Sequence, residues 1–184
     1  MKIAAKTGLL ASALGLLFAA GNSAATTYEF DQQSNAVNYC QGFVPSAANS
    51  LRNRAVGVEN VGSAAVNVAC NLGGVYSSNG SESPYQLSVY FSNNSSQDIT
   101  ISCSLLTGWQ GDPDAYVSTK SVVVPAGATS DDEYEIFWDY GDNPVPEATD
   151  LGSDLIGINC TLPHGGVIND MYLDQVLDDG QTPV

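Results

Sequence analysis

The chain has 184 residues, and its 20 Asp and Glu against five Lys and Arg give a formal net charge of −15. Nucleic acids and anionic membrane surfaces bind proteins through Lys and Arg, so this balance argues against both as partners. The length is that of a single domain and is large enough to bury a hydrophobic core. The acidity itself favours either solubility in a salty or extracellular medium or the binding of a divalent cation.

Residues 1–25 have the features of a secretory signal peptide. Lys2 and Lys6 precede an apolar run over residues 9–20, which is too short to span a bilayer. Ser23-Ala24-Ala25 supplies small residues before a cleavage point. We expect a single mature domain over residues 26–184, located in the periplasm or secreted. No later segment is long and apolar enough to span a membrane, so no membrane insertion is expected after the signal is removed.

Beyond the signal, segments that alternate apolar and polar residues are separated by turn residues such as Asn, Ser, Gly and Pro. This pattern is typical of short β-strands, and no segment has the period of a convincing amphipathic helix. We expect eight or nine strands, namely a short one near residues 37–40 and four hairpins that pair 55–61 with 65–72, 86–92 with 98–105, 116–124 with 133–139, and 155–162 with 167–173.

These strands predict an all-β fold, an antiparallel β-sandwich of the immunoglobulin-like or jelly-roll-like kind, with a barrel as the alternative. Residues 45–54 are rich in Ala, Ser and Asn and are expected to form a loop with room for one helical turn. The acidic tail from Asp174 onward is expected to fray.

One strand pattern, hydrophobic-x-hydrophobic-x-Cys-x-Leu, occurs at residues 66–72, 99–105 and 156–162, each time with the cysteine on the apolar face. The first two copies also match upstream, where Val58-Glu-Asn60-Val-Gly-Ser63 corresponds to Phe91-Ser-Asn93-Asn-Ser-Ser96. No third copy follows at that spacing, which argues against a solenoid. We expect similar hairpins in similar places of the two sheets.

The four cysteines are Cys40, Cys70, Cys103 and Cys160, and an even number in an exported chain predicts two disulfides. Zinc is disfavoured because there is no Cys-x-x-Cys pair and only one histidine. Of the three pairings we favour Cys40–Cys70 with Cys103–Cys160. The last two cysteines lie on matching strands that could face each other across a core, and the short strand at Cys40 needs an anchor.

The recurring strand motif, followed by a turn such as Leu162-Pro-His-Gly-Gly166, resembles a group of bacterial secreted proteins of unknown function. The resemblance extends over most of the mature chain and rests on structural motifs. It implies a bacterial exported β-sandwich and carries over no catalytic residue.

A turn-rich loop places Trp109 beside Asp112 and Asp114, with Tyr116 nearby. An exposed aromatic ring can stack on the apolar face of a sugar while neighbouring acids and amides bind its hydroxyl groups. These four residues are therefore a candidate ligand site. The alternative is that Trp109 covers one end of the sandwich as part of the core.

The next strand, residues 133–139, has one apolar face formed by Tyr134, Ile136 and Trp138, which we expect in the core. Phe137 is an exception on the opposite, acidic face.

Residues 131–154 are crowded with acids, which repel one another unless salt or a cation screens them. Calcium takes several oxygen ligands, and the loops of a β-sandwich can supply them, although no stretch has the EF-hand spacing. The candidate calcium site consists of Asp139, Asp142, Glu147 and Asp150.

No motif predicts catalysis. The single histidine, His164, lies in a turn, and the chain has no Gly-x-Ser-x-Gly elbow. A glycosidase needs two carboxylates at a fixed separation, and twenty acids offer no particular pair. The histidine is thus expected to be an exposed turn residue.

We expect an exported, non-enzymatic protein with a binding, adhesive or structural role at the cell surface or outside the cell. Its expected partner is a glycan or a protein, and calcium dependence is a further hypothesis. One alternative is a carbohydrate-binding module that uses Trp109 and Tyr116, and another is a small secreted hydrolase or inhibitor. The sequence leaves the ligand and the oligomeric state open.

Overall fold

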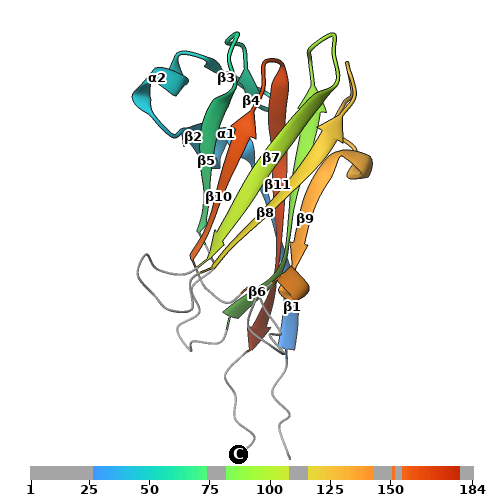
Figure 1. Cartoon of the computed structure of the whole chain (residues 1–184). Helices are drawn as coiled ribbons and strands as arrows, with labels where there is room; N and C mark the ends of the chain where they lie inside the picture. The colour runs from blue at the N-terminus through green and yellow to red at the C-terminus, as the bar shows by residue number, and fades with distance from the viewer. Residues whose placement is uncertain (1–26, 74–81, 108–115, 143–150, 152–154, 179–184) are drawn as a thin grey trace, which may run out of the picture.

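A computed structural model describes residues 27–73, 82–107, 116–142, 151 and 155–178, and it contains two antiparallel sheets packed face to face (Figure 1). The predicted β-sandwich is therefore confirmed. The expected signal peptide lies outside the described residues. Within the described part of the chain, no helix is long and apolar enough to cross a membrane.

The first sheet, sheet A, has six strands. Their order is β3 (Leu51–Arg54), β4 (Gly57–Asn60), β11 (Gly166–Asp178), β6 (Glu82–Asn93) and β9 (Glu135–Asp139), with β1 (Thr27–Asn35) also paired to β11. β1 and β4 share one side of β11, since β4 pairs with its first residues and β1 with residues 170–178.

The second sheet, sheet B, has five strands and lies in front of sheet A in Figure 1. Their order is β2 (Cys40–Gly42), β5 (Val66–Gly73), β10 (Leu155–Leu162), β7 (Ile99–Thr107) and β8 (Tyr116–Val124). Four short helical turns complete the described elements, and these are α1 (Ala36–Tyr39), α2 (Pro45–Ala48), η1 (Asp132–Tyr134) and η2 (Tyr140–Asp142).

The described residues thus hold eleven strands rather than the eight or nine expected. β1 was missed because its inward-facing positions include the polar residues Gln32 and Ser34, which hide the alternation that marks a strand. The strand expected near residues 37–40 is wrong, because α1 occupies residues 36–39 and only Cys40 starts a strand. The helical turn allowed for in residues 45–54 is α2, but β3 follows it.

All four expected hairpins are wrong in their pairing. In each case the two strands lie in opposite sheets, so each connection is an arch that leads from one sheet to the other. The pairs are β4 and β5, β6 and β7, β8 and β9, and β10 and β11. In a hairpin the two apolar faces lie side by side, whereas in an arch they face each other. Both arrangements show the same alternation and the same turn residues, so the sequence pattern does not distinguish them.

Asn60 holds the first of these arches together and is completely buried. Its side-chain nitrogen donates to the carbonyl oxygens of Ala64 at 2.9 Å and Leu162 at 2.8 Å. Its side-chain oxygen accepts from the backbone N–H of Gly62 at 2.9 Å. One amide side chain therefore joins the end of β4 to the end of β10 in the other sheet.

Asn93 does the same for the second arch and is also completely buried. Its Nδ2 reaches the carbonyl oxygens of Gln97 at 2.8 Å and of Val124 and Pro125 at 3.0 Å, and its Oδ1 accepts from Ser95 N at 2.8 Å. The upstream sequence match between the first two copies therefore marks two equivalent arches.

The two disulfides are Cys40–Cys70 and Cys103–Cys160, the pairing favoured from the sequence. The expectation that Cys103 and Cys160 face each other across the core is wrong. Each joins directly opposite residues of neighbouring strands within sheet B, with Cα atoms 4.0 Å apart in both cases. No disulfide among the four cysteines joins the two sheets.

The three copies of the cysteine motif were expected to be divided between the two sheets, and this expectation is also wrong. They are β5, β10 and β7, which lie side by side in the middle of sheet B. Their cysteines and alternating Val, Ile and Leu residues are buried against the inner face of sheet A. Trp138 and Ile136 of β9 lie in this core, as predicted, while Tyr134 is partly buried against it. Burial of these side chains is the main favourable term in folding.

Candidate functional site

The predicted ligand site at Trp109 falls largely outside the described residues. This applies to Trp109, Asp112 and Asp114, so their roles stay predictions. The backbone of Tyr116 is placed as the first residue of β8, directly opposite Thr107 of β7.

The predicted calcium site is only partly described, since Glu147 and Asp150 lie outside the described residues. Asp139 Oδ1 accepts from the backbone N–H of Gly141 at 2.8 Å, and Asp142 Oδ2 accepts from Asp139 N at 3.0 Å. These bonds stabilise the turn at η2. The described residues contain no group of three or more His, Cys, Asp or Glu suited to a metal ion, and the calcium site stays a prediction.

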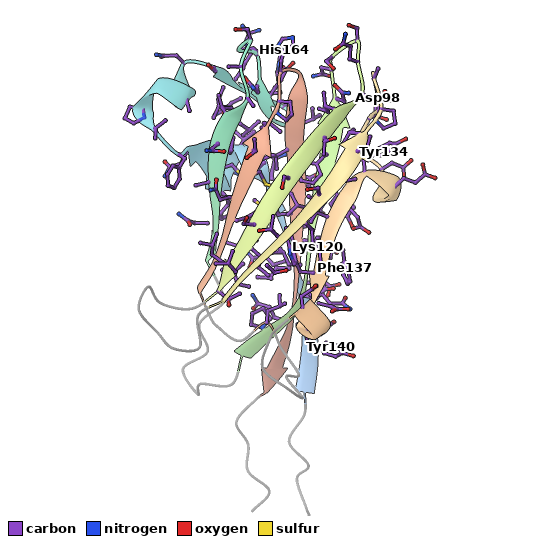
Figure 2. All side chains as sticks on the ribbon, viewed as in Figure 1. Asp98, Lys120, Tyr134, Phe137, Tyr140 and His164 are labelled. Carbon is purple, nitrogen blue, oxygen red and sulfur yellow. A yellow bond between two sulfur atoms is a disulfide. The ribbon has the colours of Figure 1, made fainter. Side chains whose placement is uncertain are left out.

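Asp142 also pairs with Lys120, whose Nζ lies 2.7 Å from Asp142 Oδ2 and 2.8 Å from the carbonyl oxygen of Phe137. Lys120 extends from β8, the edge strand of sheet B, toward β9, the edge strand of sheet A (Figure 2). The contact therefore closes one lateral side of the sandwich.

The opposite lateral side is more open. A groove of about 510 Å³ lies between the edge strands β2 and β3 and is lined by Gln41, Arg52 and Asn53 among others. The two sides of the sandwich thus differ in how the sheets meet.

His164 lies at the arch between β10 and β11 and is exposed, as predicted (Figure 2). Its Nδ1 lies 2.8 Å from the carbonyl oxygen of Gly62, which is on the neighbouring arch. The ring thus joins two arches, and no described contact gives it a nucleophile to activate.

The outer face of sheet A carries aromatic side chains at its centre. In the strand register Ser88 of β6 lies between Phe137 of β9 and Tyr172 of β11, and Tyr90 is the next outward residue of β6. The three aromatic residues are half-buried, while Ile136 and Trp138 beside Phe137 are buried in the core. Since strands lie about 4.8 Å apart, Phe137 and Tyr172 are separated by about 10 Å across Ser88.

Amides and carboxylates surround this group, which we call the aromatic face and define as Ser88, Tyr90, Phe137 and Tyr172. Gln33 of β1 lies opposite Tyr172 and is exposed. Gln86 is the next outward residue of β6 and lies opposite Asp139. The face thus combines aromatic rings with hydrogen-bonding side chains.

Asp170 lies on the same face of β11, opposite Asn35 of β1 and next to a register shift in the β11–β6 pairing. Partial burial raises the pKa of the Asp170 carboxyl above its ordinary value, because desolvation disfavours the charged form.

The outer face of sheet B is chemically different. Its outward positions in the described strands hold no Asp, Glu, Lys or Arg, and most are small hydroxyl or amide residues. Ser104 and Thr119 share a hydrogen bond of 2.7 Å between their hydroxyls, and Thr161 Oγ1 donates to Asn67 Oδ1 at 3.0 Å. Leu106, Val117 and Val123 are exposed on this face.

No protein-family model matches the chain, and no curated protein matches it. Six chains of solved structures are similar to this one, three of which have the following scores. One is named CBM4, with 12% identity, a TM-score of 0.36 and coverage of 84% of this chain and 86% of that one. A second is the exo-beta-1,3-galactanase Pc1,3Gal43A of Phanerochaete chrysosporium with galactose, at 16% identity and a TM-score of 0.35 over 82% of this chain and 29% of that one.

The third is TmCBM61 in complex with beta-1,4-galactotriose, with 7% identity, a TM-score of 0.33 and coverage of 81% of this chain and 88% of that one. This chain spans less than a third of the length of the galactanase. At these scores and identities the likeness says nothing of ligand or site.

The aromatic face was only partly visible in the sequence. Phe137 was noticed as an exception among acids, but Tyr90 and Tyr172 were not connected with it. They come from strands that follow one another in space as β9, β6 and β11 and not in sequence, so only the topology brings them together.

Proposed function

We propose that this protein is an exported, non-catalytic binding module and that it binds a glycan on the aromatic face of sheet A. The observation that carries the proposal is the placement of Phe137, Tyr90 and Tyr172 around Ser88 on the outside of a sheet. Outward positions on a solvated sheet are normally polar, whereas three neighbouring aromatic rings give this sheet an apolar platform.

The chemistry of the platform suits a sugar. An aromatic ring provides a flat apolar surface for the C–H groups of a pyranose, and few rotatable bonds make it a rigid contact. Gln33 and Gln86 each offer an amide that both donates and accepts, and Ser88 offers a hydroxyl, so the hydroxyl groups of the sugar find partners around the rings. The separation of about 10 Å between Phe137 and Tyr172 gives room for more than one sugar ring.

The ligand is expected to be a neutral or basic polysaccharide. The aromatic face adjoins Asp139 on β9 and Asp170 on β11, and the chain is strongly acidic. A polyanionic glycan would be repelled by this charge.

The experiment is retention of the mature protein on a panel of insoluble polysaccharides, followed by affinity measurement with a soluble fragment of the polysaccharide that retains it. Phe137→Ala and Tyr172→Ala should each weaken binding about tenfold, which corresponds to about 1.4 kcal/mol. Leu106→Ala is the matched control, because it removes an exposed apolar side chain from sheet B. Equal binding by all three variants would contradict the proposal.

Trp109→Ala separates this site from the one predicted at residues 109–116. Loss of retention in Trp109→Ala with full retention in Phe137→Ala would move the site to that loop. The reverse result supports the aromatic face.

A further inference from the structure

Among the described residues, one edge of the strand β8 is unpaired along its whole length. All nine of its residues pair with β7 on one side, and no described strand pairs with it on the other. The outward backbone groups can be identified from the disulfide in the neighbouring pair of strands. Cys103 and Cys160 are directly opposite with Cα atoms 4.0 Å apart, which matches the close spacing of a pair without hydrogen bonds.

The backbone N–H and C=O of Cys103 therefore point away from β10 and toward β8, where Lys120 lies opposite. Alternation along β8 then turns the backbone N–H and C=O of Val117, Thr119, Ser121 and Val123 outward. These four residues form a free ladder of donors and acceptors, a template for another strand.

The composition of β8 leaves this ladder unprotected. It contains no acidic residue, proline or glycine, in a chain with 20 Asp and Glu. Its single charge, Lys120, is directed inward to Asp142 and the carbonyl oxygen of Phe137. Of the other edge strands, β2 has three residues, β3 four and β9 five. β1, which pairs only with β11, is as long as β8 but carries Glu29 and Asp31.

We propose that two copies of this protein associate through β8, which pairs with β8 of the second copy in antiparallel fashion. Such an interface is self-complementary and is closed by a two-fold axis, the commonest symmetry of soluble oligomers. A second copy fits better than a generic partner, because the outward side chains of β8 and of the described part of sheet B are uncharged, whereas the net charge of −15 otherwise makes two copies repel each other.

The neighbouring strand limits the strength of this association. β9 is the edge of sheet A on the same side and carries Glu135 and Asp139, so two copies bring like charges together. Salt screens that repulsion and should therefore strengthen the dimer.

The dimer has a consequence for binding that rests on the proposed function. Antiparallel strands in one sheet are related by an axis perpendicular to that sheet, so both copies present their aromatic faces on the same side. A polysaccharide chain or surface could then engage both faces at once, which raises the apparent affinity without any new contact.

The test uses the oxidised mature protein without glycan, at a series of concentrations in about 0.1 M and about 1 M NaCl, where the screening length falls from about 10 Å to about 3 Å. Light scattering coupled to size-exclusion chromatography should give a dimer that increases with concentration and salt. Amide exchange of the segment 116–124 should slow as the dimer forms. A monomer under all conditions, with exchange independent of concentration, would overturn the proposal.

Two variants locate the interface. Ser121→Pro removes an outward N–H but no hydrogen bond to β7, so it should give a folded monomer. Ser102→Lys adds a charge to the outer face of sheet B on β7, directly opposite Ser121, and should still dimerise through the edge. A dimer that survives Ser121→Pro, or is lost only in Ser102→Lys, would place the contact elsewhere and overturn the proposal. If Ser121→Pro does not fold, the amide-exchange measurement on the unmodified chain tests the proposal in its place.

Polysaccharide retention separates this inference from the proposed function. Ser121→Pro should lower retention on an insoluble polysaccharide about a hundredfold while leaving affinity for a short soluble fragment unchanged. A dimer that binds no glycan would remove the proposed function alone. A glycan-binding monomer would remove this inference alone.

Discussion

The two sheets of the sandwich differ in their disulfides and in the chemistry of their outer faces. Sheet B carries both disulfides on its strands, and the described residues of its outer face are uncharged and mostly small. Sheet A has no disulfide, and its outer face gathers the aromatic rings and several carboxylates. We therefore expect sheet B to provide rigidity and sheet A to provide the proposed glycan binding, and each expectation can be tested.

Reduction of the disulfides is expected to have the largest effect on stability. Each native bridge lost should lower the free energy of unfolding by roughly 2–5 kcal/mol, which denaturant unfolding with and without reductant measures. Because both bridges lie in sheet B, amide exchange should accelerate in β7 and β10 before it does in β6 and β11. Equal acceleration in both sheets would show that the division between them is not one of rigidity.

Calcium provides the second test, because the predicted site begins at Asp139 on sheet A. A cation that binds only the folded state adds about 2.7 kcal/mol at a hundred times its dissociation constant. If the acidic run binds calcium, a thermal melt in chelator followed by millimolar calcium should show a rise in Tm that matched ionic strength does not reproduce. A rise explained fully by salt would make the acidity a matter of solvation.

The buried asparagines that hold the sheets together come third. Asn93→Ala leaves buried carbonyl groups without donors and should cost about 1–3 kcal/mol of stability. Asn60→Ala should cost somewhat less, since Asn60 donates to two carbonyls rather than three. Asn71→Ala, at an exposed position of β5, is the control and should change stability by less than about 0.5 kcal/mol. An effect of Asn93→Ala no larger than that of the control would contradict this role.

Asp170 gives the smallest expected effect. Its folded-state pKa is raised above the ordinary 3.8, so the folded chain holds this proton more tightly than the unfolded chain does. Its contribution is therefore fully present at low pH and is lost as the pH rises from about 3.8 through the folded-state pKa. Asp170→Asn should raise Tm at about pH 7 and leave it nearly unchanged at about pH 3. An equal shift at both pH values would exclude titration as the cause.

The sequence predicted most of the strands, although not β1 or β3, but it did not predict which strands lie side by side. Alternation placed Cys70, Cys103 and Cys160 on apolar faces, and the favoured disulfide pairing is correct. One of its reasons, that Cys103 and Cys160 face each other across the core, is not, because the two lie on neighbouring strands. It did not reveal that the turns after Asn60 and Asn93 are arches, because the choice depends on whether two apolar faces lie side by side or opposite each other. The repeated asparagine was visible in the sequence, but its hydrogen bonds to a strand of the other sheet were not.

The aromatic face could not be predicted for the same reason. Phe137, Tyr90 and Tyr172 are each ordinary outward residues of separate strands, and they form a group only once β9, β6 and β11 are known to be neighbours. A loop residue such as Trp109 attracts attention because it stands beside its partners in the sequence. Residues on a sheet face have their partners on other strands.

The pairing of β1 with β11 has a mechanical consequence. Thr27 lies opposite Asp178, so the two ends of the described domain leave it side by side (Figure 1). A pull applied between those ends would part β1 from β11 one residue pair at a time, like a zipper, and would load neither disulfide at first. A ligand bound on sheet A and pulled through one of these ends would therefore first extend a compliant element, the β1–β11 pair. The more rigid, disulfide-linked sheet B would bear load only afterwards.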